Sequence, residues 1–157
     1  MTQAVVTDQA VAQLTGLILT LSDRLLLLPN TAVAELVAFR HLQPAENSPS
    51  WLLGQIAWRD LSLPLLSFEA ASSNTLPTLE HARVVIINAI GDRPKFRFFA
   101  LLITGIPRSV RIDKTLQRIP GEPLEALELE VVNIDGEVAK IPDLVALEQK
   151  LADLKLI

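Results

Sequence analysis

The sequence predicts a mainly β protein built from small barrels, with one helix near the C-terminus. Short runs rich in Leu, Ile and Val recur along the chain, and Gly, Pro, Asn or Asp separate many of them, as between the strands of hairpins. The dipeptide Asp135-Gly136 lies between two such runs and suits a type I′ hairpin turn. A stripe of leucines at helical spacing follows: Leu144, Leu147, Leu151 and Leu154. Because strands and helices do not alternate, small β-barrels fit this pattern better than a parallel α/β sheet.

The first half of the chain contains two expected hairpins, formed by residues 15–21 with 24–28 and by residues 55–59 with 61–68. Between them, Thr31 is placed to cap a short helical turn over residues 32–36. In the second hairpin, Pro64 indicates an edge strand or a bulge, because proline cannot donate a hydrogen bond to a neighbouring strand. Residues 70–80 are expected to be a connector.

The second half contains further expected strands: 83–90, 96–104, 107–112, 129–134 and 137–141. The β-branched stretch over residues 83–90 is suited to a buried strand. Pro142 can serve as the first residue of the C-terminal helix, since its fixed φ and missing N–H are tolerated there. The helix then extends to about Leu154.

Length and composition indicate one compact domain. The chain has 157 residues and 50% are hydrophobic, enough for a real core behind an N-terminal arm over residues 1–14. A formal net charge of −4 provides no overall attraction for nucleic acid. The absence of Cys excludes disulfides and thiolate metal sites and fits a reducing cytoplasm. The beginning of the chain does not resemble a signal peptide, and the uncharged stretch 9–22 is too short to span a bilayer. We therefore expect a cytoplasmic protein without membrane insertion.

Charge is unevenly distributed along the second half. Residues 93–118 contain seven Lys or Arg, opposed only by Asp92 and Asp113. Residues 119–157 contain nine Asp or Glu against three Lys. Two interpretations stay open: these are two solvated faces of one protein, or one of them recruits a partner protein of opposite charge.

No residue pattern for catalysis or cofactor binding is found. His41 and His81 are far apart, with no further metal ligands beside them. Glycine-rich phosphate loops and a serine nucleophile elbow are absent. Glu128 and Glu130 share a strand face, but nothing indicates a cleft around them. The basic-aromatic run 95–99 places its rings toward the core by alternation, which argues against nucleic-acid binding. We expect a protein that is not an enzyme and needs no cofactor.

One stretch carries more information. Residues 51–68 resemble the signature of the CheW family, with Pro49 in the lead-in, Gly54 at the family's glycine, Arg59 at its arginine and Pro64 at its proline. Flanking segments are similar to further parts of the family pattern, in order: 24–36, 99–106 and 129–151. The resemblance extends over about residues 15–155.

The resemblance implies two intertwined, five-stranded SH3-like barrels packed around a hydrophobic seam. It also implies a non-enzymatic adaptor that couples the cytoplasmic tips of chemoreceptors (methyl-accepting chemotaxis proteins) to the regulatory domain of a CheA-type histidine kinase. The implied protein interface consists of Arg59, Asp60, Val33, Glu35, Leu36 and Trp51. For Arg59 the alternative is a local salt bridge, and for Val33 and Leu36 it is core packing. Of the two tryptophans, we expect Trp58 in the core and Trp51 partly exposed.

Three departures from the family pattern indicate a divergent branch. Asp60 replaces a glycine, Ser67-Phe68 replaces Asp-Leu, and Thr104 replaces a strand aspartate. In this the chain is similar to the ChpC/PilI-type couplers of type IV pilus, or twitching-motility, chemosensory systems. The alternative is a small β-barrel that binds a ligand, or a protein-interaction module outside chemotaxis. The uniformly aliphatic strands argue against the interior cavity that a ligand-binding barrel needs.

Overall fold

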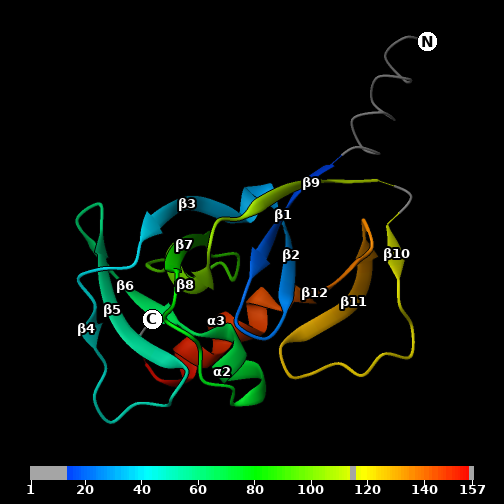
Figure 1. Cartoon of the computed structure of the whole chain (residues 1–157). Helices are drawn as coiled ribbons and strands as arrows, with labels where there is room; N and C mark the ends of the chain where they lie inside the picture. The colour runs from blue at the N-terminus through cyan, green and yellow to red at the C-terminus, as the bar shows by residue number, and fades with distance from the viewer. Residues whose placement is uncertain (1–13, 114–115, 156–157) are drawn as a thin grey trace.

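The computed structural model describes residues 14–113 and 116–155, which form two β-sheets lying side by side with helices between them (Figure 1). The first sheet has the strand order β10 (Gln117–Arg118), β11 (Glu128–Ile134), β12 (Glu137–Pro142), β2 (Leu25–Pro29), β1 (Leu14–Thr20) and β9 (Arg108–Ile112). The second has the order β3 (Val33–Ala38), β7 (Ala82–Asn88), β8 (Phe98–Thr104), β6 (Leu61–Leu66), β5 (Leu52–Trp58) and β4 (Gln43–Pro44). The helices are η1 (Asn30–Ala32), α2 (Phe68–Ser73) and α3 (Leu144–Asp153).

The chain builds the two sheets in an interleaved order. It starts in the first sheet with β1 and β2, crosses to the second for β3 to β8, and returns to the first for β9 to β12. Each six-stranded sheet consists of five longer strands and one strand of two residues, β10 or β4. The mainly β class, the two subdomains and the C-terminal helix are therefore confirmed. The expected arm over residues 1–14 lies outside the described residues except for Leu14, which opens β1.

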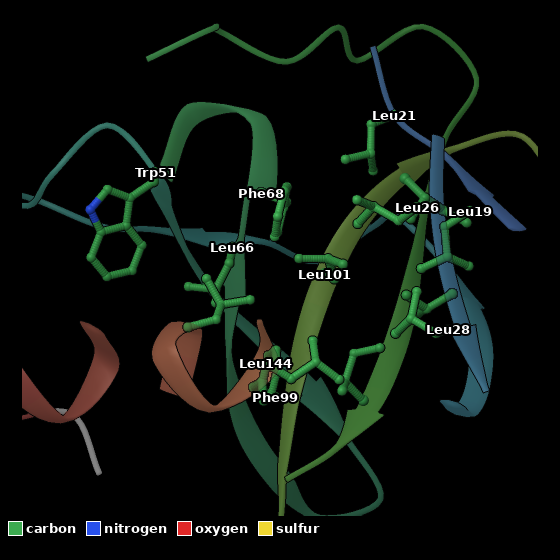
Figure 2. Close-up of a cluster of buried hydrophobic side chains, with 14 of the residues drawn as sticks. Leu19, Leu21, Leu26, Leu28, Trp51, Leu66, Phe68, Phe99, Leu101 and Leu144 are labelled. Carbon is green, nitrogen blue, oxygen red and sulfur yellow. The ribbon is translucent and has the colours of Figure 1, made fainter. Parts of the chain in front are cut away.

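Three clusters of buried side chains account for the core. One belongs to the second sheet: Ile56, Trp58, Leu63, Leu65, Val84, Ile86, Ala100 and Leu102. A smaller one belongs to the first sheet: Ile18, Leu27, Val132, Ile134 and Ala139. The largest joins both sheets to α2 and α3, and Figure 2 shows its leucines from β1 and β2 beside Phe68, Phe99 and Leu101. Burying this apolar surface is the main force holding the two sheets together.

Local turn chemistry explains the hairpins that form as expected. Asp135 and Gly136 connect β11 to β12, and both have positive φ (52° and 84°), as a type I′ turn requires. The first hairpin pairs β1 with β2, from Gly16 opposite Pro29 to Thr20 opposite Leu25. The second pairs β5 with β6.

Two predicted elements between 31 and 73 are wrong. Residues 32–36 were expected as a helical turn capped by Thr31, but only η1 is helical and Val33 begins strand β3. The strand forms because β3 pairs with β7, far along the chain, and its side chains alternate between half-buried and exposed. The expected connector over 70–80 begins with the helix α2, capped by Ser67, whose hydroxyl accepts a hydrogen bond from the Ala70 amide.

The expectation for Pro64 is met only in its second form, and that for Pro142 is wrong. The β5–β6 register shifts between Leu52 and Gly54, opposite Leu66 and Leu65, so a bulge lies beside Pro64. β6 is not an edge strand, because it lies between β5 and β8. Pro64 is tolerated because the parallel pairing with β8 involves Leu65 and Leu66, beyond the proline. Pro142 ends β12 instead of opening the helix. Asp143 caps α3 and accepts a 3.0 Å hydrogen bond from the Ala146 amide.

Buried carboxylates join elements that are distant in sequence. Glu128, whose side chain is fully buried, accepts a 2.8 Å bond from Arg24 and lies 3.3 Å from the Lys140 ammonium. Glu69 accepts bonds from the Ser22 amide (3.0 Å) and hydroxyl (2.6 Å), which ties α2 to the β1–β2 turn. Because each carboxylate has several donors, its burial is compensated. None of the helices in the described part of the chain is long and apolar enough to cross a bilayer.

Candidate functional site

The tip of the β5–β6 hairpin is a two-residue turn made of Arg59 and Asp60. Trp58 and Leu61 pair across its base. Both turn residues have positive φ, 46° for Arg59 and 63° for Asp60. A non-glycine residue with positive φ costs about 1–2 kcal/mol of stability, and less when that residue is Asp. Stability alone therefore does not explain why these two residues form the turn. What Arg59 adds at this tip is a guanidinium that is 69% exposed.

Glu35 on β3 receives two hydrogen bonds from this hairpin. Its Oε1 accepts from the Arg59 guanidinium at 3.0 Å and from the Trp58 indole nitrogen at 3.1 Å. In the hydrogen-bonded order, β7, β8 and β6 lie between β3 and β5. The sheet must therefore curl until β3 approaches β5, as expected for a barrel-like subdomain.

Trp58 lies at the centre of the group. The Arg59 guanidinium carbon lies 4.6 Å from the centroid of its ring, and Phe98 packs against it edge-on at 4.8 Å and 66°. Trp58 itself is 7% exposed, so its ring belongs to the core, while its N–H bonds Glu35 and Arg59 covers one face of the ring. The cation–π contact and the carboxylate together hold the Arg59 side chain over the hairpin.

The other two β3 residues of the expected interface, Val33 and Leu36, lie on the face of that strand opposite to Glu35. They pair with Ile87 and Val85 of the large core cluster, whereas Glu35 pairs with Ile86 of the second-sheet cluster. Val33 is half-buried and packs against the large core cluster. Leu36 points outward and is 37% exposed. The packing alternative thus fits Val33, whereas Leu36 is exposed at the surface. For Arg59, the expected local salt bridge exists, and its exposed fraction leaves donors free for a partner as well.

Trp51 does not belong to this group. It precedes β5 at the end opposite the Arg59 turn and is only 9% exposed, so the expectation of partial exposure was wrong. The Lys150 ammonium of α3 lies 5.6 Å from the ring centroid, and Trp51 belongs to the core cluster beneath that helix (Figure 2). The same cluster contains Leu147 and Leu151 of α3, so this packing joins residues far apart in the sequence.

Sequence reasoning placed Trp58 in the core, as found, but missed its polar role. The signal was present in its chemistry, since a buried indole N–H normally finds an acceptor. Phe98, which packs against Trp58 from β8, was expected only as one of the core rings of the run 95–99. Nothing local in the sequence connects Phe98 to Trp58. Among the described residues there is no group of His, Asp and Glu side chains that could hold a metal ion.

Comparisons with known proteins agree with this architecture. Residues 15–151 match the family model described as CheW-like domain. Among solved structures, the chain is similar to the crystal structure of the scaffolding protein TtCheW from Thermoanaerobacter tengcongensis, with a TM-score of 0.69 and 16% identity over 83% of this chain and 84% of that chain. No curated protein matches. Because the family model extends over most of the chain, this protein belongs to the CheW-like domain family.

Proposed function

We propose that this protein couples the cytoplasmic tip of a chemoreceptor to the regulatory domain of a CheA-type histidine kinase. Its family consists of scaffold and coupling proteins of chemosensory signalling, which are adaptors and not enzymes. The observation that carries the proposal is the Arg59 guanidinium, held exposed at a strained hairpin tip by Glu35 and Trp58. Arg is enriched at the energetic centres of protein interfaces, and strain at an exposed turn points to function.

We extend the proposed interface to Asp60 and Leu36. Asp60 follows Arg59 in the turn, and Leu36 adds exposed apolar surface on β3 next to Glu35. Arg is among the residues enriched at interfaces, and the exposed leucine adds apolar area on the other face of the same strand. Val33 packs against the large core cluster and fixes this end of β3. Trp51 is left out of the proposed interface because it is buried under α3.

The proposed output is a chemotaxis or pilus-based twitching system in the cytoplasm. The departures from the family pattern support a divergent coupler of the ChpC/PilI type. The structure gives one of these departures a physical meaning: Ser67 caps α2 with its hydroxyl, a task that aspartate also performs. Ser67-Phe68 can therefore replace Asp-Leu without loss of this helix start.

The alternative of a ligand-binding barrel has less support. Aliphatic side chains and Trp58 fill the space inside the curled second sheet. A barrel that binds a small molecule needs convergent polar groups around an interior cavity.

The experiment compares two matched arginine variants. Arg59→Glu reverses the exposed charge at the hairpin tip. Arg118→Glu is the control, because Arg118 is similarly exposed (77%, against 69% for Arg59) and pairs with Glu130 at 3.8 Å on the first sheet. Binding to a chemoreceptor cytoplasmic fragment and to the kinase regulatory domain from the same genome is measured by calorimetry. We expect Arg59→Glu to weaken binding to at least one of them by on the order of tenfold, with Arg118→Glu close to the wild type. Wild-type protein that binds neither would refute the proposal.

A further inference from the structure

A surface groove of about 640 Å³ lies next to the β5–β6 hairpin. One wall is the beginning of β6 with Gln55 of β5, and the other is formed by residues 93–97, between β7 and β8, with Phe98 at the start of β8. Its volume lies within the range typical of binding clefts, about 300–1,000 Å³. The groove is distinct from the Glu35–Arg59 pair, and neither residue lines it.

The polar side chains of this groove are mainly basic. Arg93, Lys95 and Arg97 line it, and no Asp or Glu does. Asp92 lines the neighbouring, smaller hollow instead, together with Arg97. The Arg93 guanidinium is partly engaged by Gln149 at 2.9 Å and Glu148 at 3.6 Å. Lys95 and Arg97 are exposed and form no ion pair within the described part of the chain. In a protein of net charge −4, this local excess of positive charge selects an acidic ligand.

Apolar side chains form the rest of the lining. Leu61 is 46% exposed, although it belongs to a strand, and Phe98 is half-buried. Pro64 and Pro94 add further apolar surface. An exposed apolar patch framed by cations suits a peptide that combines carboxylates with a bulky apolar side chain.

The aromatic rings argue against single-stranded nucleic acid as the occupant. Phe96 is 8% exposed and stacks on the fully buried Phe99 at a centroid distance of 6.0 Å. Binding of single strands relies on rings that are open to successive bases. These rings are directed into the core, so the groove offers apolar contacts but no open aromatic face on which bases could stack.

The basic wall is held in place before any partner binds. Glu148 of α3, fully buried, accepts hydrogen bonds from the amides of Ile90 (2.8 Å) and Gly91 (2.9 Å). The Ala89 amide donates to the Arg97 carbonyl at 2.8 Å, which closes the base of the segment. A preorganised wall lowers the entropic cost of binding.

We propose that this groove binds an acidic linear segment of a partner protein, in which a bulky apolar residue lies between carboxylates. The apolar side chain contacts Leu61 and Phe98, and the carboxylates pair with Lys95 and Arg97. This is a second docking site, and it does not rest on the proposed coupling function.

Fluorescence anisotropy tests the proposal with a panel of short labelled peptides. The panel contains glutamate-rich peptides with a central Leu-Leu or Phe-Leu pair, the same peptides with Ser-Ser at the centre, and versions with Lys in place of Glu. A single-stranded oligonucleotide is included as a competing polyanion. The full chain is compared with the double variant Lys95→Glu/Arg97→Glu and with Arg111→Glu, an exposed arginine on β9 of the other sheet.

We expect the acidic apolar peptides to bind most tightly, with affinity that falls as salt rises. The double variant should lose on the order of tenfold in affinity, while Arg111→Glu stays within about twofold of the wild type. The proposal is overturned if no acidic apolar peptide binds, if the oligonucleotide binds more tightly, or if both variants lose affinity equally. Because Arg59 is unchanged in these variants, the result is independent of the test of the coupling function.

Discussion

Glu35 on β3 accepts a 3.1 Å hydrogen bond from the indole nitrogen of Trp58 on β5, although three other strands separate β3 from β5 in the sheet. This bond, with the Arg59 contact to the same oxygen, closes the curl of the second sheet at the proposed interface. It links stability and the proposed interface, because the carboxylate that satisfies a core tryptophan also positions an exposed arginine.

Glu35→Ala should lower the free energy of unfolding by about 1–2 kcal/mol, because the Trp58 N–H loses its acceptor. Glu35→Gln keeps a neutral oxygen acceptor for Trp58 and removes only the charge opposite exposed Arg59, so its loss should stay below about 1 kcal/mol. Urea denaturation measures both. Equal losses in the two variants would show that the ion pair with Arg59, and not the Trp58 bond, carries the effect.

Arg24→Met should be among the most destabilising single changes in the chain. The Arg24 side chain is 8% exposed and bonds Glu128, Ser72, Ser73 and Asp23. Removing it leaves the buried Glu128 carboxylate with Lys140 as its remaining cation among the described residues. We expect a loss of about 3 kcal/mol in urea denaturation.

Arg108→Met provides the matched control for Arg24. Arg108 also pairs with a glutamate, Glu137, at 2.6 Å, but the two side chains are 51% and 42% exposed. The expected loss is below about 1 kcal/mol. A cost for Arg108→Met as large as that for Arg24→Met would contradict the view that burial decides the strength of these pairs.

The pH dependence of stability should include a contribution from Asp23. The hydrogen bond from the Arg24 guanidinium lowers the pKa of Asp23, against the opposing effect of its partial burial. The same hydrogen bond raises the pKa of Arg24. Because the folded protein binds a proton at Asp23 less readily than the unfolded chain does, this contribution is present above about pH 4 and is lost as the pH falls further.

Asp23→Asn should therefore flatten the loss of stability below about pH 4, measured by urea denaturation across a pH series. Asp92→Asn, at an exposed loop position, is the control and should retain the wild-type slope. If the stability of Asp23→Asn fell more steeply with falling pH than that of the wild type, the Arg24 hydrogen bond could not be the cause of the Asp23 contribution.

The Arg59-Asp60 turn should become more stable when its second residue is glycine. Asp60→Gly relieves a side chain held at φ 63° and should raise stability by about 0.5–1 kcal/mol in thermal or urea denaturation. Gly136→Asp is the converse change in the hairpin on the other sheet, where φ is 84° and an added Cβ would meet nothing within 4 Å. That variant should lose about 1 kcal/mol. If both variants shift in the same direction, backbone strain is not the cause.

The parts of the fold that the sequence predicted are those set by local chemistry. The Asp135-Gly136 turn, the paired strands around it and the leucine stripe of α3 follow from residues adjacent in the chain. The helix α2 was missed because its six residues show too little periodicity. Its support from Ser22 through Glu69 is 47 positions away. The local sequence of β3 predicts a helical turn, because the pairing with β7 that makes it a strand is likewise not local.

The candidate site was predictable only as a set of positions. The resemblance to the CheW family indicated Glu35, Arg59 and Asp60; the structure places Arg59 and Asp60 in one hairpin turn, with Glu35 of β3 bonded to Arg59. It could not indicate that Trp51 is buried, since α3 covers Trp51 only in the folded chain. The positive φ of Arg59 could not be predicted either, because the sequence of a short turn does not determine the φ values of its residues.

The most direct test of the coupling function is whether the protein bridges its two proposed partners. A chemoreceptor cytoplasmic fragment and the kinase regulatory domain from the same genome are mixed with and without this chain, and complexes are resolved by size-exclusion chromatography with mass detection. We expect the three proteins to elute as one complex, and the amount of that complex to fall with Arg59→Glu but not with Arg118→Glu. A receptor fragment and kinase domain that never elute together with this chain would contradict the proposed function.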